Sequence, residues 1–177
     1  MRMRAIGLLM LIGLVGLLIP RPASADAFVT PFLGATFGGD TPSTQPTYGV
    51  AVGGMGGNIF GVEGEFGYTP NFFNHGTGVT SSHVMTLMAN VLLGAPLGPI
   101  RPYVTAGAGM IRQQRDLSVS GLLSQISSSD FGINFGGGAR FMLTSHLSLR
   151  GDVRYFKVEK SGGLGFWRGY AGLAIGF

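Results

Sequence analysis

The 177-residue chain contains no cysteine, which excludes disulfides and thiol chemistry. Charged residues make up only 11% of the sequence, and the basic ones form no cluster that would follow a phosphate backbone, so no nucleic-acid binding is expected. The three histidines are scattered without metal-ligand spacing, and no cofactor is implied. Beyond residue 25 there is no run of about eighteen apolar residues, so no transmembrane helix is predicted there.

The first 25 residues have the composition of a secretory signal peptide. Arg2 and Arg4 form a basic start, Ala5 to Ile19 form an apolar stretch, and Ala23-Ser24-Ala25 supplies the small residues of a cleavage site. The apolar stretch is short for a membrane span, which favours a cleaved peptide over an anchor helix. We therefore predict a signal peptide at 1–25 and a single exported domain at 26–177, which contains nine basic and eight acidic residues.

The exported part is apolar in composition although it lacks an apolar helix. Glycine and phenylalanine are abundant, with 32 and 13 copies in the chain, while charge is low. This combination is typical of a transmembrane β-barrel, in which each strand carries only a weak hydrophobic signal. A barrel also closes its sheet without disulfides.

The last eleven residues give the strongest indication of such a strand. Side chains on a strand alternate between two faces, and a strand in contact with lipid needs one apolar face. One face carries apolar groups at Trp167, Ala171, Leu173, Ile175 and Phe177, whereas the other carries Arg168, Tyr170, Gly172, Ala174 and Gly176. A terminal strand of this kind, ending on an aromatic residue, indicates a transmembrane barrel.

Eight strand-like segments recur along the exported part. They are predicted at 27–38, 47–55, 59–68, 82–93, 102–112, 130–141, 147–158 and 167–177. Each is near the roughly 9–11 residues that cross a membrane at a tilt. The predicted fold class is therefore all-β, an eight-stranded antiparallel up-and-down transmembrane β-barrel preceded by a cleavable signal peptide.

The connections between these segments alternate in length. The longer ones are at about 39–46, 69–81, 113–129 and 159–166. Because outer loops are long and periplasmic turns are short, both termini are predicted on the periplasmic side. Alternation over Leu117 to Ser120 further predicts that the third outer connection extends the strands beyond the membrane as a hairpin. Trp167 and Phe177 then suit the outer and inner aromatic girdles.

Charged side chains mark the face that points into the lumen. In the third segment Glu63 and Glu65 lie opposite Val62 and Phe66, and carboxylates are costly in contact with lipid. The same alternation in later segments completes a predicted lumen charge network of three acids and three bases: Glu63, Glu65, Arg140, Arg150, Asp152 and Arg154. Arg168 is a further base nearer the mouth.

Two interpretations of this network follow from the width of the barrel. Eight strands enclose a lumen just wide enough for side chains to fill, and buried charges need partners. The favoured interpretation is a closed salt-bridge network that plugs the barrel. The alternative is a polar gate that re-pairs and passes small ions, in which case Arg140→Ala would change single-channel openings.

Three local features bear on how the strands are oriented and paired. Segment 102–112 fits two phases, of which we prefer the one with Val104 and Met110 outward. Pro31 lacks a backbone N–H and predicts either a bulge or an end of regular pairing. Glycines within strands are expected to relieve crowding in the narrow lumen.

Several motifs resemble those of a known family. Arg101 to Gly109 reads RPYVTAGAG, Gly136 to Arg140 reads GGGAR, and Asp152 to Tyr155 reads DVRY. With the strand pattern, these segments resemble the OmpA-like eight-stranded outer-membrane β-barrel family over 27–177. The resemblance implies a place in the outer membrane of a Gram-negative-type cell envelope. We expect a monomer in contact with outer-membrane lipid and lipopolysaccharide.

The C-terminal pattern Tyr170, Gly172, Ile175 and Phe177 resembles the signal that the barrel-assembly machinery recognises. That machinery and periplasmic chaperones are therefore the partners implied for biogenesis. The predicted role is structural, with display of surface loops. The alternatives are a narrow passive channel and a surface adhesin. The adhesin is considered because apolar groups such as Phe72 and Phe73 lie in a predicted outer loop. The other interpretation of these groups is that they pack on each other.

A remote alternative is a lipid A-modifying enzyme. Ser81 and His83 share a face near the outer end of segment 82–93. A hydrolase of this type needs an acid to orient the histidine, and neither Glu63 nor Glu65 is on that face. We therefore predict that the protein is not an enzyme.

Overall fold

The computed structural model describes residues 25–73, 79–119, 122–160 and 163–177, with side chains at 27–73, 82–114, 128–160 and 163–177. The predicted signal peptide lies outside the described residues except for Ala25, so its cleavage stays a prediction. The strands are β1 (Ala25–Phe37), β2 (Gln45–Gly56), β3 (Phe60–Pro70), β4 (Val79–Gly94), β5 (Ile100–Val119), β6 (Leu122–Met142), β7 (Leu147–Val158) and β8 (Gly165–Gly176). No helix in these ranges has the length and apolar character to cross a membrane.

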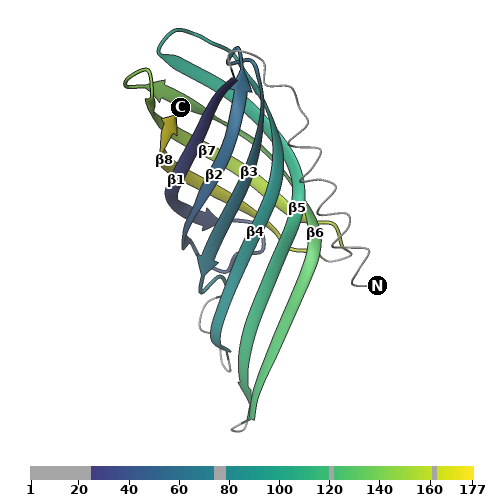
Figure 1. The fold of residues 1–177 in the computed structure, drawn as a ribbon. Helices are drawn as coiled ribbons and strands as arrows, with labels where there is room; N and C mark the ends of the chain where they lie inside the picture. The colour runs from purple at the N-terminus through teal and green to yellow at the C-terminus, as the bar shows by residue number, and fades with distance from the viewer. Residues whose placement is uncertain (1–24, 74–78, 120–121, 161–162) are drawn as a thin grey trace.

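The eight strands form one closed antiparallel barrel (Figure 1). Each strand pairs with its neighbour in sequence, and β8 pairs back with β1. This confirms the predicted fold class and the order of the segments. The largest difference from the predicted bounds is in β5 and β6, which run to Val119 and from Leu122 and so confirm the extended hairpin. In Figure 1 this hairpin projects beyond the ends of the other strands.

Side chains alternate between lipid and lumen as the sequence predicts. In β3, Phe60 and Val62 are 59% and 51% exposed, whereas Glu63 and Glu65 are buried. In β5, Val104 is exposed and Tyr103 is buried, which settles the phase of that strand in favour of the preferred one. Exposed apolar groups surround the barrel, among them Leu33, Val62, Leu87, Val91, Val104, Phe131, Phe135, Leu149, Val153 and Leu173.

Tight turns gather at one end of the barrel. In the turn between β2 and β3, Gly57 and Asn58 have φ of 57° and 59°, and the Ile59 amide donates to the Gly56 carbonyl at 3.1 Å. Positive φ at both central residues is the type I′ geometry that matches the twist of a hairpin. The Gly176 amide donates to His146 in the β6–β7 turn, so the C-terminus lies at the same end. We call it the periplasmic end because short turns lie on that side of such barrels.

Pro31 interrupts one ladder without shifting its register. It pairs in register with Val50 of β2. The ladder between β1 and β8 passes from the pair Val29–Ile175 to the pair Phe32–Gly172 and has no pairing at residues 30 and 31, although the register is the same on either side. The bulge alternative is therefore wrong, and an interruption of pairing is what a missing N–H produces.

Candidate functional site

Inward side chains form three layers along the barrel axis. An apolar outer layer lies at the loop end and consists of Phe72, Val84, Met88, Ile111, Phe156, Val158, Leu164 and Phe166. The charge network lies below it, at mid-barrel. Toward the periplasmic end follows a smaller apolar cluster of Phe28, Met55, Leu92 and Tyr103. Strand alternation places these groups inward, because each is on the lumen parity of its strand, except for Phe72 and Leu164, which lie outside the strands.

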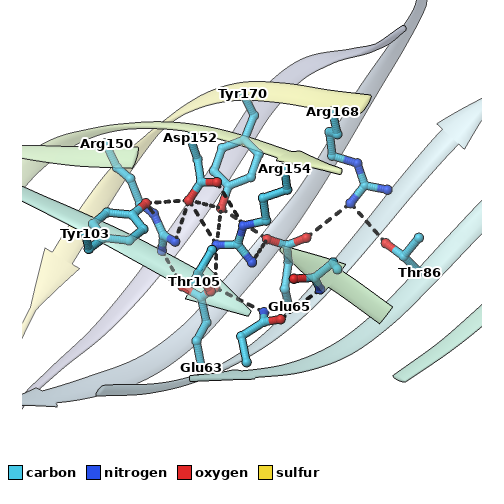
Figure 2. A network of polar contacts seen from close by, with 12 residues as sticks. Glu63, Glu65, Thr86, Tyr103, Thr105, Arg150, Asp152, Arg154, Arg168 and Tyr170 are labelled. Atoms are coloured by element: carbon cyan, nitrogen blue, oxygen red, sulfur yellow. Dashed lines mark hydrogen bonds and ion pairs between the residues drawn. The ribbon is translucent and has the colours of Figure 1, made fainter. Parts of the chain in front are cut away.

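Asp152 is the centre of the charge network (Figure 2). Its carboxylate accepts from Arg150 Nη2 at 3.0 Å and from Arg154 Nε and Nη2 at 2.8 and 2.9 Å. Alternate residues of β7 share a face, which is why both arginines flank this carboxylate. All three side chains are fully buried.

The two glutamates of β3 complete the ion pairs. Glu63 accepts from Arg150 Nη1 and, at 2.9 Å, from Arg154 Nη2. Glu65 pairs with Arg154 Nη1 and Arg168 Nη1, each at 3.1 Å, and Arg168 also donates to Thr86 Oγ1 at 3.0 Å. Each acid thus contacts two arginines. Such pairing offsets the large cost of burying a charge.

Two tyrosines belong to the network, although the sequence analysis did not include them. Tyr103 donates to Asp152 and accepts from Arg150 Nε at 2.6 Å. Tyr170 Oη lies 3.1 Å from Glu65 Oε2 and 3.2 Å from Asp152 Oδ2, and its ring stacks on Phe32 at 4.1 Å. Both residues have lumen parity in their strands, and that parity was the available signal.

Arg140 lies apart from the other predicted members of the network. Its guanidinium is 3.8 Å from the centre of the Phe28 ring, at the periplasmic side of the acids. Its Nε and Nη2 have no hydrogen-bond partner among the described residues, and the side chain is only 5% exposed. The structure therefore brings together Glu63, Glu65, Arg150, Asp152, Arg154 and Arg168, and leaves Arg140 outside.

Glycines make room for these large side chains. A Cβ added to Gly138 would lie 2.7 Å from Tyr103 Oη, closer than real contacts of this kind. A Cβ at Gly67 would collide with the Arg168 guanidinium. At these two positions the glycine leaves room for a side chain that fills the lumen, while an added Cβ at Gly34 or Gly109 would first meet the backbone of the neighbouring strand.

The apolar outer layer fills the lumen on the loop side of the charges. Phe166 stacks on Phe156 with ring centres 5.1 Å apart and meets Phe72 edge-on at 5.2 Å. Phe72, predicted in an outer loop, is fully buried here and contacts Phe73. Of the two interpretations of that loop, mutual packing therefore applies to Phe72. The Arg168 guanidinium lies 4.4 Å from the Phe156 ring centre and joins the two layers.

The outward face carries aromatic rings near its outer boundary. Tyr68 contacts Tyr48 and His83, each with ring centres 5.4 Å apart, and Tyr155 contacts Trp167 at 5.2 Å. Rings at this level are typical of a membrane interface. His83, considered above as a catalytic base, thus contacts the ring of Tyr68. The Ser81 side chain and His75 lie outside what the structure describes. Within the described ranges no three His, Cys, Asp or Glu side chains are grouped to hold a metal.

The residues of the predicted assembly signal divide between the two faces. Ile175 and Phe177 are exposed, at 48% and 75%, whereas Tyr170 is buried in the charge network. A Cβ on Gly172 would lie 2.6 Å from the Pro31 carbonyl oxygen, so the close approach of β1 explains this glycine. Recognition of these residues by the assembly machinery stays a prediction.

Solved structures with the same fold include outer-membrane barrels. Neisserial surface protein A is 14% identical, with a TM-score of 0.67 over 87% of this chain and 99% of that one. OprG from Pseudomonas aeruginosa is 15% identical, with a TM-score of 0.64 over 86% and 96%. Ail, the attachment invasion locus protein of Yersinia pestis, solved with the heparin analogue sucrose octasulfate, is 15% identical, with a TM-score of 0.56 over 85% and 98%.

Sequence comparison identifies the family. No curated protein matches the chain. The sequence model of the outer membrane protein beta-barrel domain matches residues 11–174, which is nearly the whole chain. The closed barrel, its apolar outer face and this match place the protein in the cell outer membrane. The chain belongs to the outer membrane protein beta-barrel domain family.

Proposed function

We propose that the protein is a structural component of the outer membrane whose closed barrel anchors surface loops. One observation carries this proposal: the charge network and the apolar outer layer fill successive levels of the lumen. Passage of an ion would require separating Arg150 or Arg154 from their carboxylates, which exposes uncompensated buried charge and costs several kcal/mol. A catalytic role has no support in the described residues, and unchanged lipid A in mass spectra after expression is the expected result.

Planar bilayer recordings test the closed lumen. Purified protein should give a baseline no different from that of a mock preparation taken from cells without the gene. Discrete openings of the wild-type protein would contradict the structural role and support the passive channel. Because Arg140 lies outside the network, Arg140→Ala is expected to leave the recordings silent.

The projecting hairpin of β5 and β6 favours surface contact as a second candidate function. Ail, a similar barrel, was solved with a heparin analogue, and its name describes attachment. In cells that display the protein, residues 114–127 are replaced by Asn-Gly, which joins the paired residues Gln113 and Ser128. Weaker retention on heparin beads than the wild type would support adhesion, and equal retention would reject the hairpin as the contact.

We also propose that the protein works as a monomer, delivered by periplasmic chaperones and inserted by the barrel-assembly machinery. Closure of the barrel leaves no unpaired strand edge for a second chain, which supports the monomer. Chemical cross-linking in isolated outer membranes should give a single band at the monomer mass. A ladder of bands containing only this protein would contradict it.

A further inference from the structure

We propose that the periplasmic mouth of the barrel is a binding site for a phosphate group, held by Arg140 together with Arg101. The site is separate from the charge network and is independent of the proposed structural role. Its evidence is the register of three arginines, two donors of Arg140 that have no hydrogen-bond partner among the described residues, and a cavity that Arg140 and Arg101 line.

Three arginines lie side by side across neighbouring strands. Arg101 of β5 is the register partner of Arg140 in β6, and Arg140 is the register partner of Arg150 in β7. Like charges directly opposite each other in a sheet are destabilising. Arg150 is compensated by Glu63 and Asp152, but no described carboxylate pairs with Arg140. An anion at this point would remove the repulsion.

The guanidinium of Arg140 has the properties of a preformed hydrogen-bond donor to an anion. Its guanidinium carbon lies over the Phe28 ring, 3.8 Å from the ring centre, and the residue is 95% buried. Among the described side chains, Nε and Nη2 have no hydrogen-bond partner. These two nitrogens lie on one edge of the guanidinium plane, which is the edge that binds two oxygens of a phosphate at once. A buried cation with unused donors is costly unless a ligand meets it.

A cavity of about 120 Å³ lies at this mouth. Among its lining residues are Phe28, Arg101, Arg140, His146, Ser148 and Phe177. The side chain of Arg101 is held at the rim of the cavity, because its Nη1 donates a hydrogen bond to Asn58 Oδ1 at 2.5 Å. Two guanidinium groups beside a small cavity suit a compact, doubly charged oxoanion better than a sugar or an apolar ligand.

Phosphate reaches this end of the barrel from two sources. One is inorganic phosphate in the periplasm, and the other is the phosphoryl headgroup of an anionic phospholipid in the inner leaflet. Phe177 also lines the cavity, so a terminal carboxylate on this residue would be a further anion at the same mouth. The experiment must therefore separate a free ion, a lipid headgroup and the chain's own terminus.

The test uses the full-length exported protein refolded in maltoside micelles, which contain no phosphate. Isothermal titration with inorganic phosphate and, separately, with dihexanoylphosphatidylglycerol is run at fixed ionic strength. We expect one phosphate bound per barrel, and affinity for the preferred probe lowered at least about tenfold by Arg140→Gln, since hydrogen bonds to a charged group are lost. Tighter binding of the lipid assigns the site to the headgroup, and equal or tighter binding of the ion assigns it to free phosphate.

Lys160→Gln is the matched control, because it removes one positive charge from an exposed side chain at the loop end. It should leave the affinity unchanged. Absence of binding to the wild type, as expected if the Phe177 carboxylate occupies Arg140, would overturn the proposal, and so would equal binding by Arg140→Gln. If that variant fails to fold, as judged by heat-modifiable migration on a gel, Arg101→Gln decides: weaker binding supports the site, and unchanged affinity rejects it.

Discussion

At the scale of single residues, the barrel depends on a few carboxylates that each serve several donors. Asp152 accepts from Arg150, Arg154 and Tyr103, all of them buried. In a partly exposed pair such as Lys160 and Asp130, 3.5 Å apart, the lysine has water as an alternative partner. Ion pairs of similar chemistry are therefore unequal in their contribution to stability.

Asp152→Asn should lower the free energy of unfolding by about 3 kcal/mol or more, because it leaves two buried arginines short of an acceptor. The measurement is a guanidinium titration of the protein refolded in lipid vesicles, followed by tryptophan fluorescence. Asp130→Asn is the control, with an expected loss under about 1 kcal/mol. Equal losses in the two variants would show that burial is not what makes the network important.

The period of two in the strands predicts which side chains enter the lumen but not which of them meet. It placed Glu63, Arg150 and Asp152 inward, where they pair. It also placed Arg140 inward, yet this residue stacks on Phe28 instead of reaching an acid. Which inward side chains meet depends on their level along the barrel axis. That level is set by the stagger between strands, which the pattern of a single strand does not contain.

At the scale of the strand, the side chains that face lipid must be apolar but do not need to match the shape of a fixed neighbour. Leu87, 59% exposed, lies on the outward face of β4 between Met85 and Ala89. A lipid molecule is its neighbour in the membrane. Replacement of such a residue by a charged one is costly in proportion to its depth.

Leu87→Arg should therefore destabilise the folded barrel by about 2–4 kcal/mol, as for charges near the bilayer midplane. The same vesicle titration measures it. Leu97→Arg, in the exposed turn between β4 and β5, is the control and should change stability by less than about 1 kcal/mol. Comparable effects at the two positions would contradict the assignment of the β4 face to lipid.

Strands were predicted well because each needs the same length and the same alternation to cross the membrane. The extended hairpin was anticipated from alternation at Leu117 to Ser120, and it exists to Val119. Burial of Phe72 was not anticipated, because the direction of a side chain beyond the end of β3 depends on contacts with Phe166 from a distant strand.

At the scale of the whole molecule, the barrel is a cylinder with lipid outside and filled layers inside. Closure pairs every strand on both sides, so stability does not depend on disulfides, which the chain lacks. β1 begins at Ala25, one residue before the predicted start of the exported domain.

We predict that the protein in isolated outer membranes begins at Asp26. Intact-mass spectrometry of the purified protein measures this directly, with the unprocessed chain from cytoplasmic inclusion bodies as the control. A mass that includes residues 1–25 would show that the leader is retained. Unboiled samples from the same membranes should migrate faster than boiled ones on a gel, because the closed barrel is compact.

The missing ladder contacts at Thr30 and Pro31 have a mechanical consequence. They fall in the joint between the first and last strands, where the two ends of the chain meet and the entropic cost of closure is greatest. We therefore expect β1 and β8 to pair last during insertion. For the same reason, they should be the first strands to separate when the barrel is pulled apart by an external force.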